Sequence, residues 1–370
     1  MNILIVEPYY TGSHAAWAEG YRAHSRHDVE ILKLAGANWK WRMHGGAVTL
    51  ARRFEAASLS PDLVLATDML DVTTFQALTR RDTASVPFAM YFHENQLSYP
   101  WSPTDRDVLN KRDRHYGFIN YASALACDAV FFNSDYHRRS FFEELVRLLR
   151  HFPDHNEPGS IEVLRGRSSV LPLGLDLRRF DEAPVAGRGP KAPPLVLWNH
   201  RWEYDKNPEG FFEALYRSAD AGLGFEVAIL GENFSQRPDV FEQARKRLGE
   251  RVVQYGYAES FAAYAGWLRA ARVAPVTSNQ DFFGASVVEA IYCGARPVLP
   301  RRLAYPELLP EAWHSAVFYE DAEGLMARLT QALGEHWDGA EPLRRHVSRF
   351  DWTSMAAVYD DALESLTNEN

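Results

Sequence analysis

Short aliphatic or β-branched runs alternate along the chain with longer segments whose apolar residues recur at helical spacing. In the first half the runs predict six strands, at 3–6, 29–32, 63–66, 88–92, 129–132 and 169–172. Amphipathic segments lie between them, for example 14–22 and 136–149, and predict helices. Strands separated by helices indicate βαβ units and a parallel sheet covered on both faces.

The pattern pauses at 182–194, where Pro, Gly and Ala concentrate as in a linker, and then restarts. The second half predicts strands at 195–198, 226–230, 252–254, 273–276, 296–299 and 316–318, and helices at 207–221, 241–248, 260–271 and 286–293. The sequence therefore predicts an α/β protein with two Rossmann-like, doubly wound domains, at 1–185 and 186–352. A last helix at 353–370 is expected to cross back to the first domain. Ligands of such folds bind at the carboxyl ends of the strands, so we expect a central cleft between the two sheets.

Composition narrows the class of protein. A length of 370 residues fits two domains, because single cores stop growing at about 250–300 residues. Cys127 and Cys293 stand in unrelated contexts, which argues against a disulfide framework or a zinc cluster. The net charge of −9 is not that of a dedicated nucleic-acid binder. The start of the chain reads as a strand, and no apolar run reaches the ~18–20 residues of a membrane span, so a cytoplasmic protein is expected.

Two carboxylates eight positions apart form the strongest motif. Asp281 opens a loop that ends at Gly284, and Glu289 lies in the helix that follows. Backbone N–H groups at a helix N-terminus bind phosphate or sugar oxygens, and Glu289 would lie about two turns further along, within reach of a ribose diol. The alternative is an ordinary connection from loop to helix that carries an exposed acid.

Two cations follow the first strand of the second half. Arg201 and Lys206 would supply positive charge where negative charge grows on a departing diphosphate. A polar turn with surface charges is the alternative. Asn207 and Pro208 then begin the next helix, because Pro suits an early helical position.

The first half offers its own polar segments after two strands. Gly12 permits close backbone approach to a ligand, and Ser13 is expected to act as a helix N-cap, which alone would explain the pair. His93 follows the fourth predicted strand in a stretch that also contains Glu94, Asn95, Gln96 and Tyr99. Polar groups at the carboxyl end of a central strand point into the expected cleft.

Together these motifs resemble the GT-B retaining glycosyltransferases of the family 4 type. The motif of that family is an acidic residue and a glutamate separated by seven residues. Asp281 stands here where that family usually has Glu, so the contact of this acid with the donor must come from a shorter side chain. The resemblance implies that Asp281 and His93 contact the donor sugar, that Glu289 holds the ribose, and that Arg201 and Lys206 clamp the diphosphate without a metal. It implies further donor contacts from Gly12, Ser13, Gly231, Tyr257, Phe282, Phe283 and Gly284.

A closer resemblance covers nearly the whole chain. The stretches EPYYTGSH, FHENQLSYP, FFNSDYHRRSF and NHRWEYDKNP resemble the tRNA-queuosine mannosyltransferases. That resemblance implies retaining transfer of mannose from GDP-mannose to the cyclopentenediol of queuosine in tRNA-Asp, with no cofactor. The acceptor residues would be Glu94, Asn95, Gln96, Tyr99, Arg112 and Arg138. Basic clusters at 111–115 and 137–139 would contact phosphates, although each alone also fits a solvated helix face.

Three other functions stay open at this point. The same fold could glycosylate a lipid or a saccharide, act as a non-hydrolysing nucleotide-sugar epimerase, or bind tRNA or nucleotides without catalysis. Asp105 and Asp107 match the Asp-x-Asp metal signature of another glycosyltransferase fold. They precede a helical run, so we interpret them as first-turn acids rather than as metal ligands.

Overall fold

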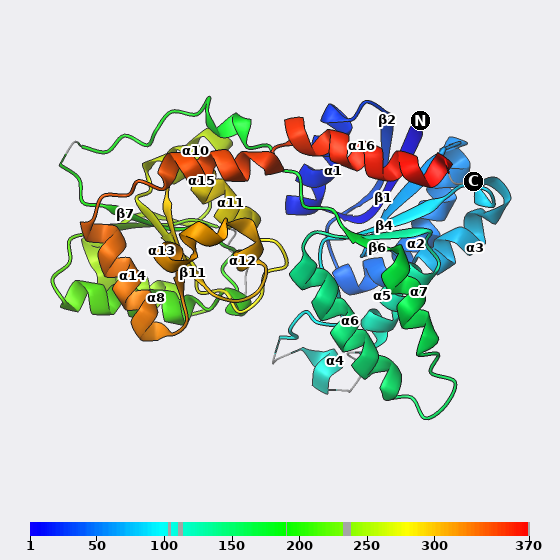
Figure 1. Cartoon of the computed structure of the whole chain (residues 1–370), viewed down its shortest axis with the longest axis horizontal. Coiled ribbons are helices and arrows are strands. Elements are labelled where there is room, and N and C mark those ends of the chain that lie inside the picture. Colours follow the sequence, from blue (N-terminus) through cyan, green and yellow to red (C-terminus); the bar gives the residue numbers. More distant parts are fainter. Residues whose placement is uncertain (103–104, 110–113, 190, 232–237, 369–370) are drawn as a thin grey trace. The chain divides into compact units, whose positions relative to one another are not determined.

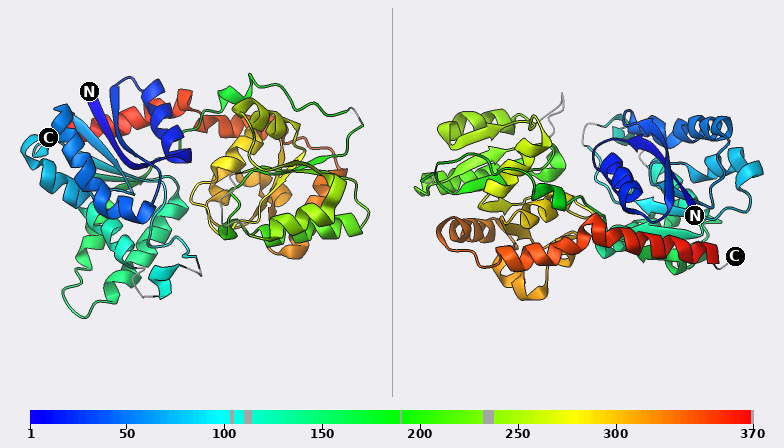
Figure 2. Two further views of the ribbon diagram at one scale, coloured as in Figure 1. Left: turned by 180° about the vertical axis from the view of Figure 1, so that it is seen from behind. Right: turned by 90° about the horizontal axis from the view of Figure 1, so that it is seen from above.

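The computed structural model describes residues 1–102, 105–109, 114–189, 191–231 and 238–368. Contacts divide the chain into two compact units, the first formed by 1–175 with 352–370 and the second by 176–351. The sequence places the corresponding boundaries at 185/186 and 352/353. Each unit contains one six-stranded sheet whose recorded strand pairs are all parallel (Figures 1 and 2). The predicted α/β class with two doubly wound sheets is confirmed.

The first unit has the sheet order β2-β1-β3-β4-β5-β6. Its elements are β1 (Asn2–Tyr10), α1 (Gly12–His24), β2 (Asp28–Ala35), α2 (Trp39–Ala57), β3 (Leu63–Thr67), α3 (Val72–Thr83), β4 (Phe88–Phe92), α4 (Arg106–Leu109), α5 (Arg114–Leu125), β5 (Ala129–Phe132), α6 (Asp135–Arg150), α7 (Gly159–Arg167), β6 (Ser168–Val170) and α16 (Trp352–Asn368). The chain adds β2 on one side of β1 and β3 on the other. The carboxyl ends of β1 and β3 therefore flank the position where a doubly wound sheet binds its ligand.

The second unit repeats this plan with the order β12-β11-β10-β7-β8-β9. Its elements are β7 (Leu195–Trp198), α8 (Pro208–Asp220), β8 (Glu226–Ile229), α9 (Val240–Leu248), β9 (Val252–Tyr255), α10 (Phe261–Ala270), β10 (Val273–Pro275), α11 (Ala285–Tyr292), β11 (Arg296–Pro300), α12 (Tyr305–Leu308), α13 (His314–Val317), β12 (Phe318–Tyr319), α14 (Ala322–Gly334) and α15 (Ala340–Val347), with short 3-10 turns that include η2 (Tyr204–Lys206). The direction of winding reverses between β7 and β10, so the loops after these two strands share the binding edge.

The strand predicted at 316–318 is largely wrong. Residues His314–Val317 form α13, and β12 begins at Phe318. A three-residue apolar run has too little periodicity to separate a buried helical turn from an edge strand.

The last helix packs on the first unit. In Figures 1 and 2 α16, coloured red, lies beside α1, where Trp17 donates to the Tyr359 hydroxyl at 3.0 Å and Tyr21 donates to Asp360 at 2.8 Å. Gly174 is needed at this contact, because a Cβ there would lie 2.5 Å from the Trp352 ring. No helix in the described part of the chain is long and apolar enough to cross a bilayer.

Candidate active site

The loop after β7 is tied to the start of α11. Asn199 donates its side-chain amide to the main-chain carbonyl of Ser286 at 2.8 Å. The His200 ring nitrogen Nδ1 lies 2.9 Å from the Ser286 hydroxyl. Burial, together with the positive charge of Lys206, lowers the pKa of His200 to about 3, so this ring is neutral. The two switch-point loops of the second unit are therefore joined by neutral hydrogen bonds.

Lys206 lies at the centre of this joint. Its ammonium donates to the Gln280 carbonyl at 2.7 Å, lies 3.1 Å from Asp205 Oδ2, and lies 4.0 Å from Asp281 Oδ2. The Lys206 side chain is 11% exposed and that of Asp281 is 17% exposed. A cation and an acid predicted from separate motifs thus lie together beside α11. The Tyr305 hydroxyl also donates to Asp281, at 3.2 Å.

Glu289 lies inside α11 and faces a tyrosine of α10. The Tyr264 hydroxyl donates to Glu289 Oε2 at 2.6 Å. Burial raises the pKa of Glu289 to about 7, although the bond from Tyr264 opposes that rise. The carboxylate is consequently poised to change its charge near neutral pH.

The turn before α11 uses its aromatic side chains for packing. Phe282 and Phe283 are each 5% exposed, and Phe283 packs edge-on against Phe350 with ring centres 5.2 Å apart. Gly284 is the N-cap of α11 with φ of +96°. A Cβ there would approach Tyr305 and Leu308 to 3.2 Å, so a side chain is disfavoured. That this turn contacts the donor remains a prediction. The contacts would be made by its backbone N–H groups.

Three other predicted donor residues differ in their surroundings. The Arg201 side chain is 46% exposed and pairs with Glu203 at 3.2 Å, unlike the buried Lys206. Gly231 has φ of +124°, and a Cβ there would lie 2.0 Å from the His200 carbonyl oxygen. This glycine lets the loops after β7 and β8 pass closely. Tyr257 is 73% exposed beyond β9.

In the first unit the N-cap prediction for Ser13 is wrong. Helix α1 begins at Gly12, and Thr11 is the cap residue, with an extended backbone and no side-chain cap bond. The Thr11 carbonyl accepts from the backbone N–H groups of His14 and Ala15 at 3.1 and 3.3 Å. The helix therefore starts two residues before the expected position, with Gly12 at φ of +48° and Ser13 exposed in the first turn.

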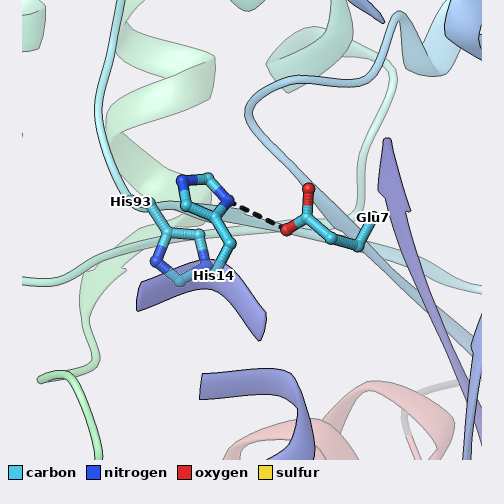
Figure 3. A group of neighbouring side chains, drawn as sticks. All are labelled: Glu7, His14 and His93. Carbon is cyan, nitrogen blue, oxygen red and sulfur yellow. Dashed lines mark hydrogen bonds and ion pairs between the residues drawn. The ribbon is translucent and has the colours of Figure 1, made fainter. Parts of the chain in front are cut away.

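The carboxyl ends of the central strands meet at His93. The His93 backbone N–H donates to Asp68, directly after β3, at 2.8 Å. Its carbonyl accepts from Asn133, directly after β5, at 3.0 Å. Glu7 in β1 pairs with His14 in α1 at 3.0 Å, and the His14 and His93 rings have centres 4.1 Å apart, tilted by 37° (Figure 3). Four strands therefore contribute to one buried polar cluster.

This cluster has an unequal distribution of charge. Although burial disfavours a charged imidazole, the Glu7 carboxylate raises the pKa of His14 to about 9. Burial lowers the pKa of His93 well below its usual value, and the His14 charge lowers it further. Burial raises the pKa of Asp68 to about 8. At neutral pH the cluster thus holds a His14–Glu7 ion pair beside an uncharged His93.

By distance alone Glu7, His14 and His93 could hold a metal ion, since one ligand atom from each lies within 4.8 Å of the others. The ring geometry fits direct ring contact better. Two imidazoles bound to one tetrahedral zinc would have centres roughly 5 Å apart, with their nitrogens converging. The observed centres are 4.1 Å apart with the ring planes tilted by 37°, closer than that zinc geometry requires.

The predicted acceptor segment after His93 forms a tight turn. Asn95 is fully buried, and its side-chain oxygen accepts from the backbone N–H groups of Leu97 and Ser98 at 3.0 and 2.8 Å. Gln96 is 8% exposed and donates to Glu94 at 2.8 Å. The Asn95 side chain therefore shapes the turn, while Glu94 and Tyr99 are partly exposed beside it.

The predicted basic cluster at 137–139 is only partly at the surface. His137 is fully buried with its Nδ1 2.9 Å from Asn133, so it does not belong to a basic surface. Arg138 is partly exposed and pairs with Asp135 at 2.8 Å. Arg112 lies outside the described residues. Asp105 and Asp107 both pair with Lys40, the former at 2.6 Å, and Asp105 lies directly before α4.

Sequence reasoning missed Glu7, His14, Asp68 and Asn133 at this site. For Asp68 and Asn133 the signal was positional, because a polar residue directly after a buried parallel strand faces the binding edge. Glu7, inside β1, and His14, in α1, gave no such signal before their pairing was located in space. Tyr264 and Tyr305 were missed for another reason. Their hydroxyls meet Glu289 and Asp281 only through tertiary packing.

Comparison with known proteins agrees with this architecture. A family model described as "tRNA-queuosine alpha-mannosyltransferase N-terminal" matches residues 2–175. The tRNA-queuosine alpha-mannosyltransferase of Drosophila melanogaster is 32% identical over 320 residues, which cover 84% of this chain and 82% of that protein. The D-inositol 3-phosphate glycosyltransferase 2 of Catenulispora acidiphila is 27% identical over 225 residues, or 54% of this chain and 52% of that protein.

Solved structures extend the likeness over the whole chain. A sucrose-phosphate synthase of Thermosynechococcus elongatus gives a TM-score of 0.72 at 15% identity and covers 100% of both chains. A UDP-forming alpha,alpha-trehalose-phosphate synthase of Burkholderia xenovorans gives 0.70 at 14% identity, over 98% of this chain and 100% of that one. The fold is therefore that of the GT-B glycosyltransferases. Together with the extended sequence identity, this shows that the chain is a glycosyltransferase and belongs to the tRNA-queuosine alpha-mannosyltransferase family.

Proposed function

We propose that this chain transfers mannose from GDP-mannose to the cyclopentenediol of queuosine in tRNA-Asp, with retention at the anomeric carbon. The observation that carries the proposal is the identity of 32% to the Drosophila relative over 84% of the chain. A stretch of that length spans both units rather than one shared domain. A cytoplasmic location, where tRNA is available, is part of this proposal.

The donor chemistry is assigned to the second unit. As the bond from sugar to phosphate breaks, negative charge grows on the departing GDP, and the Lys206 ammonium with the N–H groups of α11 stabilises it. Arg201 adds a second, more exposed cation. Asp281 orients the mannose, and Glu289 binds the ribose hydroxyls. Fixed protein charge thereby does the work that a metal does elsewhere, and we propose that none is required.

Retention follows from attack on the face that the phosphate leaves. The acceptor hydroxyl forms the new bond to the anomeric carbon, the bond to GDP breaks, and the transition state resembles an oxocarbenium ion. The leaving phosphate oxygen takes the acceptor proton, so no side-chain nucleophile is needed. His93 in the first unit hydrogen-bonds a sugar hydroxyl through its uncharged ring.

The experiment is a donor panel. Purified protein is incubated with queuosine-containing tRNA and GDP-mannose, UDP-glucose or UDP-galactose, and the digested nucleosides are weighed by mass spectrometry. The expected result is a gain of one hexose on queuosine with GDP-mannose. Matched tRNA that carries guanine in place of queuosine is the control and should gain nothing.

The other outcomes discriminate the rivals. Hexose gain with another donor would change the sugar but keep the tRNA acceptor. Conversion of the free nucleotide sugar to an epimer, without mass gain on tRNA, would replace the proposal by epimerase activity. Mass gain on a lipid or saccharide, without mass gain on tRNA, would show that the acceptor is that lipid or saccharide.

A further inference from the structure

From the arrangement around His93 we infer that Glu7 and His14 are positioning residues for transfer, and that their ion pair fixes the orientation and the uncharged form of the His93 ring. In this form Nε2 is held for a substrate hydroxyl. The inference rests on the proposed role of His93 in transfer and deepens it. Neither Glu7 nor His14 is assigned a contact with substrate.

The first supporting observation is how tightly the His93 ring is enclosed. His14 lies against one face with ring centres 4.1 Å apart (Figure 3). Trp17 meets the ring nearly at a right angle, at 4.7 Å, and Tyr91 is at 5.0 Å. Contacts of this kind restrict both side-chain torsions, and they add to the main-chain bonds from His93 to Asp68 and Asn133.

The second observation is an unsatisfied atom. His93 Nε2 is buried and has no hydrogen-bond partner among the residues that the structure describes. A buried polar atom without a partner is destabilising, so proteins seldom leave one except where a ligand or water completes it. A sugar hydroxyl would restore this bond.

The third observation is electrostatic. Glu7 is fully buried and His14 is 7% exposed, so their pairing at 3.0 Å places a fixed positive ring directly against His93. A second proton on His93 would set two like charges in contact, which disfavours it. The ionisable groups that face or adjoin His93 are Glu7, His14, Asp68, Tyr91, Glu94 and His137.

The first test reads His93 directly and needs no activity. Histidine-labelled protein is titrated by NMR, with His93 assigned from a His93→Gln variant. In the unaltered protein the His93 signal should stay neutral throughout the accessible acidic range. In His14→Gln the repelling charge is gone, so the pKa of His93 should rise. Glu7→Gln should raise it as well, because His14 then loses the partner that keeps it charged.

The second test reads transfer. Glu7→Gln and His14→Gln should each lower kcat on the order of tenfold or more, and move its acidic limb to higher pH. Affinity for GDP alone should change much less than kcat, because Lys206 and Glu289, to which the phosphate and ribose contacts are assigned, belong to the second unit. The double variant should cost about as much as either single change, since both remove one ion pair.

The chain supplies a matched control. His27 pairs with Glu364 at 3.0 Å in the same unit, and its side chain is 7% exposed. His27→Gln therefore removes a histidine–carboxylate contact of the same length whose acid is 36% exposed, and it should leave the pH profile of kcat and the His93 titration in place. If His27→Gln moved both as far as His14→Gln does, the effect would be general destabilisation and the inference would be lost.

Failure of this inference differs from failure of the proposed function. Transfer by the unaltered protein, with folded Glu7 and His14 variants that keep its pH profile and its His93 titration, would overturn the positioning role alone. Absence of hexose transfer to tRNA from any donor would overturn the proposed function. The NMR titration would then still decide whether the ion pair controls His93.

Discussion

The Lys206 ammonium lies 4.0 Å from Asp281 Oδ2 while it donates to the Gln280 carbonyl at 2.7 Å. This contact brings together a cation after β7 and an acid after β10, the two strands at which the winding of the second sheet reverses. Lysine is held there by main-chain and carboxylate oxygens, so its charge is fixed in direction before donor binds. Such preorganised charge is effective because it requires no reorganisation during reaction.

Lys206→Ala should therefore lower kcat for transfer on the order of 100-fold or more, because one partner of the departing phosphate is lost. Steady-state rates at saturating donor measure the effect, and thermal unfolding checks that the variant is folded. Arg201→Ala is the comparison, since the Arg201 side chain is 46% exposed. Its loss should be smaller. A folded Lys206→Ala protein with an unchanged rate would remove the clamp from the mechanism.

The two carboxylates of the motif should have separable roles. Glu289→Gln should weaken the binding of GDP, because a carboxylate accepts stronger hydrogen bonds from ribose hydroxyls than an amide does. Asp281→Asn should leave GDP affinity nearly intact and abolish most sugar transfer. Calorimetry with GDP and rate measurements with the whole donor separate these effects. The opposite order of losses would contradict the assignment.

Glu289 also predicts a pH dependence for donor binding. Burial raises its pKa to about 7, so the free protein holds a protonated Glu289 below neutrality and an ionised one above it. If the ionised form binds ribose, GDP affinity should rise about tenfold between pH 6 and pH 8. Tyr264→Phe removes a bond that stabilises the carboxylate, so the rise should move to higher pH. The same curve in Glu289→Gln would show that another group titrates.

Much of the fold was accessible from sequence because buried parallel strands are short apolar runs between amphipathic helices. Lys206 and Asp281 were each predicted at the donor site from motifs that follow a strand, but the contact between them was not predicted. The role of Glu7 was not predicted. A glutamate inside a strand is interpreted as an exposed polar residue until the partner that compensates its burial, here His14, is located in space. Arg201 shows the converse, because a sequence cannot say which of two nearby cations is buried.

Metal independence is a separate prediction. In the proposed mechanism Lys206 and the start of α11 supply the charge that a metal would, and Asp105 and Asp107 pair with Lys40. Transfer should persist in excess EDTA with donor and tRNA freed of divalent ions. Loss of activity that returns only with Mn²⁺ or Mg²⁺ would refute this prediction. Repeating the assay with Lys40→Ala and with His93→Gln would then show whether the metal depends on the acids beside Lys40 or on the His93 cluster.

The acceptor makes the last prediction. A tRNA acceptor requires phosphate contacts, so binding should weaken with added salt, with a slope that reports the number of contacts. The net charge of −9 argues for few of them, and we expect micromolar rather than nanomolar affinity. Arg138→Glu should raise the KM for tRNA and flatten the salt slope, while GDP affinity stays constant.

Arg147→Glu is the matched control, because Arg147 lies further along α6 and pairs with Glu144 as Arg138 does with Asp135. Arg112→Glu tests the other predicted basic cluster in the same way. Equal losses for Arg138→Glu and Arg147→Glu would indicate a general charge effect, and a KM for tRNA that neither Arg138→Glu nor Arg112→Glu changes would place the tRNA on another surface.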